Sequence, residues 1–432
     1  MPLHFPTVKH RRVEAAFDGG AITSDGGVLL LSQVDRQLGL TRAVARALGD
    51  ARTRRRCTHS LLSLLRQRVY GLALGYADQN DHQTLRHDPA LQTAVGRDTA
   101  LAGQATLSRL DNRADRAAAW AIHRVLVEQF IASFTSAPAE LVLDLDATDD
   151  RVHGLQEGRC FNAYYDDYIF LPLYVFCGER LLVAYLRSAE HGQAHHAAAV
   201  VRLLVARLRQ AFPQTRLVLR GDSAFARPRL LSWCERQGVG YVLGLATNSR
   251  LRALAEPWLA AARDAHQASG QKSRRIGLLS EYRAHSWPYA RRVVVRAEAG
   301  EQGDDARFIV TNLVQDPRAL YTDLYCARGE MENRIKEQQL DLFADRTSCH
   351  GWWANQFRLL LSSLGYVLLE GLRRLALGGT ELAHATCGTL RLRLLKIGAL
   401  IVRNTRRVRL LLASACPWQR EFIYAARSLG AG

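Results

Sequence analysis

The sequence lacks the patterns that mark zinc ribbons, secreted disulfide scaffolds and membrane proteins. Its eight cysteines are scattered and form no C-x-x-C pair, which indicates a reducing compartment and no disulfide framework. Residues 1–12 contain no apolar stretch of the kind a secretory signal needs, so we expect no signal peptide. The run that comes nearest to a membrane span, residues 359–369, is too short and contains two serines, so we expect no membrane partner.

Basic charge dominates the composition. The 432 residues include 58 Lys and Arg against 41 Asp and Glu, for a formal net charge of +17. A globular protein with this excess usually binds a polyanion, and arginine, which outnumbers lysine by a wide margin, suits phosphate through its planar fork. Because 48% of the residues are hydrophobic, the chain can bury a large core, and its length predicts two or three domains.

The N-terminal third predicts mostly helices. Residues 28–48 and 59–74 carry apolar side chains at helical spacing, and residues 105–134 mix apolar and basic positions in the same way. No helix-turn-helix signature is present, so DNA binding by this region is predicted from composition alone. Two arginine runs, at 54–56 and 403–409, suit contacts with DNA phosphates and equally suit solvated surface.

From residue 139 the pattern changes to strands. Three expected strands are followed by helix, strand, helix and strand, which predicts a mixed α/β fold with a sheet covered by helices. Residues 247–305 interrupt the alternation and read as an insertion that contains a helix and a strand. The expected elements are strands 141–146, 169–176 and 181–186, helix 194–210, strand 216–220, helix 228–237, strand 241–245, helix 251–265, strands 291–296 and 307–310, and helices 317–339 and 352–375.

Three acidic residues lie where such a fold could bring them together. Asp146 ends the first expected strand, Asp222 follows the fourth, and Glu332 lies in the long helix at 317–339. Carboxylates at strand ends can converge above a sheet, and a helix packed across it can add a third. Mg²⁺ prefers such oxygen ligands, and two ions roughly 3.5–4 Å apart can activate a nucleophile and stabilise the leaving oxygen of a phosphodiester.

One face of that helix is polar where a buried face would be apolar. Tyr325, Arg328, Glu332, Lys336 and Gln339 share it at about 3.6 residues per turn. The face offers a metal ligand between two cations that could grip phosphates. The same charges also suit a solvated face with an ion pair four residues apart.

These residues carry a resemblance to a known family. The spacing of Tyr325, Arg328 and Glu332 matches the Tyr–Arg–Glu signature of DDE-type insertion-sequence transposases. Residues 144–148 resemble the family's first-acid motif, an Asp followed two places later by Thr, and residues 220–225 resemble its second-acid motif. Together the three motifs, in the right order, favour the metal site over the solvated face.

More specifically, the chain resembles the thirteen-eighty insertion-sequence family over nearly its whole length. Residues 23–27, 164–168 and 331–338 support this resemblance. One position departs from the pattern of related transposases, which often have a Lys seven residues after the Glu. Here Gln339 stands in that place, and Lys336, four residues after the Glu, is the candidate replacement.

The resemblance implies a fold and a function. The fold would be an RNase-H-like catalytic core with a strand-rich insertion domain between the second Asp and the Glu, after a helical N-terminal region. The protein would be a cut-and-paste transposase of the bacterial cytoplasm, associated with the nucleoid, that binds terminal inverted repeats and target DNA as a homodimer. It would use Mg²⁺, with two ions expected and Mn²⁺ as a substitute. The implied domains are 1–138 (helical, DNA-binding), 139–246 (first part of the core), 247–305 (insertion), 306–376 (second part of the core) and 377–432 (basic C-terminal region).

The implied site has three catalytic and metal-binding acids and three DNA-contacting residues. The acids are Asp146, Asp222 and Glu332, and the DNA contacts are Tyr325, Arg328 and Lys336. Asp144 remains an alternative first acid, because it lies on the same face of its strand as Asp146.

Other candidates have simpler interpretations. Glu330 and Glu337 point away from the polar face of the helix and are expected to be exposed. His191, His195 and His196 could suggest a metal cluster but fit a helix start better, and Trp287 fits a core position better than a base-stacking one. Two other functions stay open: an RNase-H-like nuclease without strand transfer, and a transposase-derived DNA-binding protein that has lost catalysis.

Overall fold

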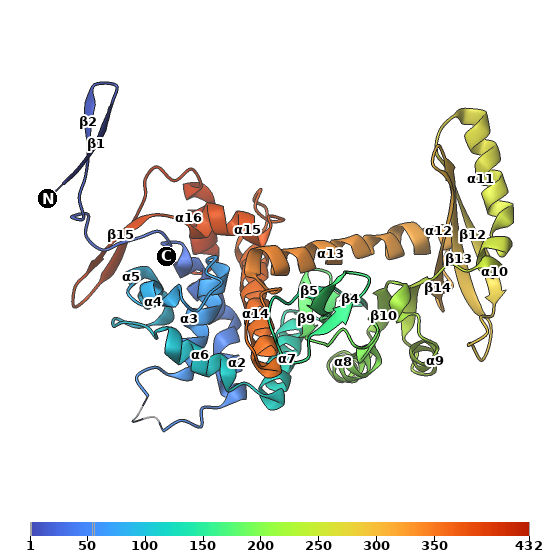
Figure 1. Cartoon of the computed structure of the whole chain (residues 1–432), viewed down its shortest axis with the longest axis horizontal. Coiled ribbons are helices and arrows are strands. Elements are labelled where there is room, and N and C mark those ends of the chain that lie inside the picture. The colour runs from blue at the N-terminus through green and yellow to red at the C-terminus, as the bar shows by residue number, and fades with distance from the viewer. Residues whose placement is uncertain (1, 54, 56, 432) are drawn as a thin grey trace. The chain divides into compact units, whose positions relative to one another are not determined.

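A computed structural model describes residues 2–53, 55 and 57–431, which fall into two compact units (Figure 1). The sheet unit comprises His123–Lys336 and Thr347–Leu359, and the helical unit comprises the chain up to Ile122, Glu337–Arg346 and the chain from Leu360 onward. Two arginines of the run at 54–56, Arg54 and Arg56, lie outside the described residues. No helix in the described part of the chain is both long and apolar enough to cross a membrane.

A mixed sheet organises the sheet unit, as the sequence predicted. Within the described residues eight strands form it in the order β12-β13-β14-β11-β10-β4-β8-β9. Neighbours β4, β10 and β11 are parallel, and the other neighbouring pairs are antiparallel. The strands are β4 (Glu140–Ala147), β8 (Leu173–Cys177), β9 (Arg180–Tyr185), β10 (Arg216–Gly221), β11 (Gly240–Leu245), β12 (Ser273–Tyr282), β13 (Arg291–Gly300) and β14 (Gly303–Thr311).

Side-chain alternation along β4 separates a core face from a site face. Leu141, Leu143 and Leu145 are buried in a hydrophobic cluster that includes residues of α8 (Ala197–Ala211) and α9 (Pro228–Arg236). Residues 142, 144 and 146 therefore point to the opposite face, whose smaller core contains Leu320 and Tyr321 of the helix after β14. Alternation thus places both candidate first acids on the face that this helix covers.

The segment 247–305 adds helices and strands beside the core strands. It contains α10 (Ser249–Leu254), α11 (Glu256–Ser269), β12, β13 and the start of β14. The strands continue the main sheet beyond β11, and α11 lies along them (Figure 1). The residue pattern had indicated a single strand here, while the family resemblance implied a strand-rich insertion; the residues of β12 themselves were not predicted to form a strand.

The expected helix at 317–339 is present but irregular. It consists of α12 (Pro317–Ala319), a π-helical turn (Leu320–Tyr325), a 3₁₀ turn (Cys326–Arg328), α13 (Gly329–Lys336) and a second π-helical turn (Glu337–Asp341). Such turns depart from 3.6 residues per turn, so a face read from ideal periodicity fails beyond α13.

Because of this irregularity, the expected exposure of the two flanking glutamates is seen for Glu330 but not for Glu337. Glu330 is exposed, as expected. The expectation for Glu337 was wrong, because this side chain is buried in the helical unit, where it forms an ion pair with Arg373 at 3.0 Å. It also accepts a hydrogen bond from the backbone N–H of Cys387.

The strand expected at 169–176 is divided by Pro172. Because proline has no N–H to donate to a ladder, β7 (Asp167–Phe170) ends before it and β8 begins after it. β7 instead joins β5 (Asp150–Arg151) and β6 (Cys160–Asn162) in a separate three-stranded sheet, which we call the small sheet.

Helices make up most of the helical unit, and its described residues also form two small sheets. The helix expected at 28–48 is broken by Gly39, whose φ of 65° ends α1. Strands β1 to β3 were not predicted. The elements are β1 (Leu3–Val8), β2 (Arg11–Ala15), β3 (Ile22–Thr23), α1 (Val28–Leu38), α2 (Leu40–Leu48), α3 (Leu61–Ala73), α4 (His82–Leu85), α5 (Pro89–Val95), α6 (Gln104–Asn112), α15 (Cys387–Leu390), a π-helical turn (Arg391–Leu395), β15 (Ala399–Arg403), β16 (Val408–Leu412) and α16 (Gln419–Ser428). The remaining helices are α7 (Arg116–Ala132) and α14 (Trp352–Ala376).

Candidate active site

Two of the candidate acids lie at the same edge of the main sheet. β4 and β10 are adjacent and parallel, with Leu145 opposite Gly221, so Asp146 and Asp222 each follow this matched pair. The carboxylate of Asp222 accepts a hydrogen bond from the backbone N–H of Ala224 at 2.9 Å, which caps a short 3₁₀ turn. The register of two parallel strands therefore brings these acids together.

Arg328 connects the third acid to the first. Its guanidinium donates to Asp146 Oδ2 at 3.2 Å and to Glu332 Oε1 at 2.8 Å. The side chains of Asp146 and Arg328 are largely enclosed, whereas that of Glu332 is 45% exposed. The helix that carries Arg328 and Glu332 therefore adds one cation and one carboxylate above the end of β4.

Crowding of carboxylates perturbs the first acid. The pKa of Asp146 is raised to about 6, mainly by burial; Arg328 opposes the rise, and the negative charges of Asp222 and Glu332 add to it. Burial lowers the pKa of Arg328, but Asp146 and Glu332 outweigh burial and leave it raised, so this residue stays charged. The site is thus an acidic cluster in which one arginine supplies the neutralising charge.

Asp144 has a different environment from Asp146. It is buried, and both of its carboxylate oxygens accept hydrogen bonds from Arg220 on β10, the bond from Nη2 being 2.7 Å long. The remaining nitrogen of Arg220, Nη1, donates to the backbone carbonyl of Leu324, just before the helical segment that bears Arg328. Asp144 is therefore held inside the sheet by its own cation, while Asp146 faces the other acids.

The sequence did not identify Arg220 as part of this arrangement. A signal was nevertheless present: Asp144 and Arg220 each lie two residues before a candidate acid, and they are opposite each other in the β4–β10 register. Opposite charges at matched positions of two buried strands predict a cross-strand pair.

Tyr325 lies against the turn that holds Asp222. A Cβ on Gly244 of β11 would lie 2.9 Å from the Tyr325 hydroxyl and 2.8 Å from the backbone nitrogen of Ser223, so only glycine fits between them. Burial raises the pKa of Tyr325, and the nearby Asp222 raises it further. The hydroxyl therefore packs beside the second acid.

Lys336 is not brought into this cluster. Its side chain is exposed, and among the described residues no hydrogen bond or ion pair joins it to Asp146, Asp222 or Glu332. Five of the six predicted site residues therefore gather at one edge of the sheet, and the sixth lies on the same helix beyond them.

The donors of this cluster suit a divalent cation in chemistry but not in their present positions. In the part of the chain that the structure describes, no three His, Cys, Asp or Glu side chains are close enough to hold a metal ion. Arg328 stands between the carboxylates of Asp146 and Glu332 and binds both. The negative charges of Asp222 and Glu332 act on Asp146. A divalent cation bound by the three carboxylates would relieve this repulsion.

The remaining candidates are three histidines and Trp287. The ring of His195 lies tilted against the rings of His191 and His196, at 4.2 and 3.8 Å between centroids, and within the described residues no group of metal-binding side chains includes them. Trp287 is 3% exposed and packs edge-on against Tyr282, as expected for a core residue.

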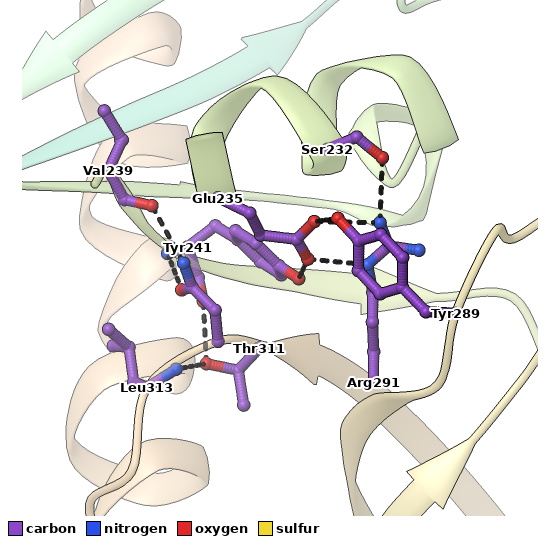
Figure 2. A network of polar contacts seen from close by, with 9 residues as sticks. Ser232, Glu235, Val239, Tyr241, Tyr289, Arg291, Thr311 and Leu313 are labelled. Carbon is purple, nitrogen blue, oxygen red and sulfur yellow. Dashed lines mark hydrogen bonds and ion pairs between the residues drawn. The ribbon is translucent and has the colours of Figure 1, made fainter. Parts of the chain in front are cut away.

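A polar network links α9 to strands β11 and β13 of the main sheet (Figure 2). Glu235 of α9 accepts hydrogen bonds from Tyr241 of β11 at 2.7 Å, from Tyr289, and from Arg291 of β13 at 2.7 and 3.0 Å. Arg291 also donates to Ser232 at 3.0 Å. One carboxylate thus joins α9, β11 and β13, which the sequence did not indicate.

A comparison with protein families agrees with the motifs. The family model for the transposase DDE domain, group 1, matches residues 5–431, so the chain belongs to this family. The predicted membership of the DDE-type transposases is therefore confirmed. Among solved structures, the chain is similar to piggyBac transposase in a cryo-EM synaptic complex with hairpin DNA, with 9% identity and a TM-score of 0.42 over 86% of this chain and 79% of that one. No curated protein sequence matches.

Proposed function

We propose that this protein is a DNA transposase that binds the terminal inverted repeats of its own element, cleaves at their ends and joins the released ends to target DNA. The observation that carries the proposal is the gathering of Asp146, Asp222 and Glu332 around Arg328, in a chain that belongs to a DDE transposase family. The net charge of +17 supports a DNA partner.

The three acids are the proposed ligands of Mg²⁺, with two ions expected and Mn²⁺ as a substitute. Bound there, the ions would supply activation of the attacking oxygen and neutralisation of the leaving one. Asp146, whose side chain is largely enclosed and whose pKa is raised, would hold the ions together with Asp222 and Glu332. Arg328 binds one carboxylate oxygen of Asp146 and one of Glu332, so a cation bound by the acids would compete with these two contacts.

Both proposed reactions are in-line displacements at phosphorus. In cleavage, a water oxygen forms a bond to phosphorus, the bond from phosphorus to the 3′ oxygen breaks, and that oxygen leaves as a 3′-hydroxyl. In strand transfer, this hydroxyl attacks a target phosphodiester and displaces the target's own 3′ oxygen. Because both steps need the same positioning and charge, one site can perform them in turn.

The basic and tyrosine residues of the helix are the proposed DNA contacts. Arg328, once it turns from a carboxylate, is placed to hold a non-bridging phosphate oxygen next to the acids. Tyr325 would keep the Asp222 turn and the helix in register through its contact beside Gly244. Lys336, exposed one turn further along, would contact the DNA backbone away from the cleaved bond.

The proposed architecture is an RNase-H-like core with an insertion, flanked by DNA-binding regions. The antiparallel meander β4-β8-β9 next to parallel β10 and β11, with acids at the ends of β4 and β10, supports such a core. We assign the core to residues 139–246 and 306–376, the insertion to 247–305, and DNA binding to residues 1–138 and 377–432. A homodimer on the paired repeat ends, associated with the bacterial nucleoid, is part of the proposal.

The experiment compares binding with cleavage. The expected result is that Asp222→Ala still shifts a duplex carrying the element's end in a gel but no longer cleaves it with Mg²⁺. Glu330→Gln, a change at an exposed acid on the same helix, serves as the matched control and should cleave normally. Cleavage by Asp222→Ala would show that the site is misassigned, and cleavage without joined products in the wild type would indicate a nuclease instead.

A further inference from the structure

An exposed aromatic loop projects from the small sheet. Strands β6 and β7 pair Phe161 with Tyr168, and the connecting residues 163–166 form the tip, which we call with its flanks the tyrosine loop (residues 161–168). Phe161 is 49% exposed, Tyr164 87% and Tyr168 42%. Three large aromatic side chains exposed together within eight residues indicate a binding surface rather than a core.

The rings are arranged in contact with each other and with a cation. Phe161 and Tyr168 pack edge-on at 5.6 Å between centroids, and Tyr164 packs edge-on against Tyr165 at 4.9 Å. The guanidinium of Arg159 lies 4.2 Å from the centre of the Tyr168 ring. Aromatic faces combined with arginine are the features that bind unstacked nucleic-acid bases, because every base has a π face and a phosphate beside it.

The backbone of the tip is held in one conformation. The N–H of Tyr164 donates to the side-chain oxygen of Asn162 at 3.0 Å, and the N–H of Tyr165 donates to the Asn162 carbonyl at 3.2 Å. Asp166 then takes a φ of 50°, in the left-handed region that Asp tolerates. The rings are therefore presented by an ordered turn, which lowers the entropy lost on binding.

The loop lies beside the proposed active site. β5 begins four residues after Asp146 and pairs with β7, so the small sheet continues directly from the strand that carries the first acid. Burial raises the pKa of Tyr165, and the charges of Asp149, Asp146 and Asp222 contribute to the rise. Tyr165 therefore lies within electrostatic reach of these acids, while its neighbour Tyr164 is exposed.

We propose that the tyrosine loop binds a base displaced from the duplex beside the phosphodiester that is cut. Tyr164 and Tyr168 would stack against the base, Arg159 would contact its phosphate, and Tyr165 would lie near the acids. The occupant is DNA because the loop is continuous with the proposed cleavage site and places a guanidinium among its rings. This inference rests on the proposed function and adds a second contact to it.

The experiment measures base stacking directly. The probe is a 30-base-pair duplex with one unpaired 2-aminopurine opposite an abasic site, incubated with the full-length protein and Ca²⁺. Stacking on an aromatic ring quenches the fluorescence of 2-aminopurine, and anisotropy of a dye at the far end of the duplex reports total binding. The fully paired duplex of the same sequence is the reference, and the exposed Phe17 of the helical unit supplies the matched aromatic control, Phe17→Ala.

The wild type should quench the unpaired probe more than the paired one. In Tyr164→Ala, half-maximal quenching should need roughly 5- to 150-fold more protein, the range expected for loss of one base–aromatic stack, with a smaller change in anisotropy. Tyr164→Phe should quench as the wild type does, because it retains the ring. Equal quenching by Tyr164→Ala and the wild type, or equal quenching of the two duplexes, would overturn the inference.

Failure of this inference and failure of the proposed function give different results. Asp222→Ala keeps the tyrosine loop and should quench the probe normally while cleaving nothing. If Asp222→Ala cleaves, the assignment of the acids fails whatever the fluorescence shows. If it does not cleave and Tyr164→Ala quenches normally, the acids stand and only the loop assignment fails.

Discussion

Replacing Arg220 by Met should destabilise the sheet unit more than any change at an exposed ion pair. Arg220 donates two hydrogen bonds to Asp144 and one to the Leu324 carbonyl, and its side chain is 9% exposed. The methionine fills similar space but leaves the Asp144 carboxylate, 2% exposed, without a cation. Breaking a buried pair from one side costs about 3–5 kcal/mol, because an uncompensated charge remains inside.

The loss of unfolding free energy in Arg220→Met should grow as the pH rises. Burial already raises the pKa of Asp144, even with Arg220 present to lower it. Without Arg220 this pKa rises further, so Asp144 folds as the neutral acid at low pH. A folded pKa above the unfolded one means that stability falls as pH rises between the two values. Arg220→Met should therefore be least destabilised near pH 4 and most destabilised above the raised pKa of Asp144.

The assay is urea unfolding followed by tryptophan fluorescence, which reports mainly on the sheet unit because five of the seven tryptophans lie there. Arg207→Met, which breaks an exposed pair with Glu128, is the control and should cost at most about 1 kcal/mol. Adding Asp144→Leu to Arg220→Met should restore most of the loss. The reasoning would be refuted if Arg220→Met and Arg207→Met lost the same free energy of unfolding, or if the double variant recovered none of the loss.

Four further changes test other parts of the structure. Trp287→Ala should cost about 3–5 kcal/mol in the same unfolding assay, because a buried aromatic side chain is lost. Gly244→Ala should cost about 1–3 kcal/mol and reduce cleavage rates, because the new methyl group displaces Tyr325; normal cleavage would show that the contact is dispensable. Burial raises the pKa of Glu235, but hydrogen bonds from Arg291 and two tyrosines outweigh burial and leave the pKa lowered. The wild type should therefore be more stable than Glu235→Gln above about pH 4.3, and this difference in stability should disappear as the pH falls below that value. Lys336→Ala should weaken DNA binding at all sequences and reduce the slope of log affinity against log salt by about 0.9, measured by anisotropy; an unchanged slope would remove Lys336 from the interface.

The parts of the fold that were predictable follow from local patterns. Alternating leucines in β4 and the apolar spacing of α8 and α14 indicate burial within a few residues, so these elements were expected close to their observed bounds. The exposed strands β1 and β2, and β12, have no regular alternation of buried and exposed positions, so they were not expected. These strands depend on the strands with which they pair, and the local sequence does not identify those partners.

Site residues that belong to sequence motifs could be predicted, because the motifs fix their spacing. Contacts that depend on tertiary packing could not be predicted. The end of β4 could place Asp144 and Asp146 on one face, but only the partner strand shows that Arg220 neutralises Asp144. The burial of Glu337 depends on a π-helical turn, which periodicity does not indicate. The electrostatic effect of Asp146 on Tyr165, from a separate sheet, was likewise invisible in the sequence.

We propose that Asp146, Asp222 and Glu332 together hold the catalytic cations. The most direct measurement is Mn²⁺ binding to the protein with duplex DNA carrying the element's end, followed by electron paramagnetic resonance of the free ion. Asp146→Asn, Asp222→Asn and Glu332→Gln should each bind less Mn²⁺ than the wild type while the DNA complex keeps its gel mobility, and Glu330→Gln should bind as the wild type does. Wild-type Mn²⁺ binding by the variant with all three acids replaced would contradict the account.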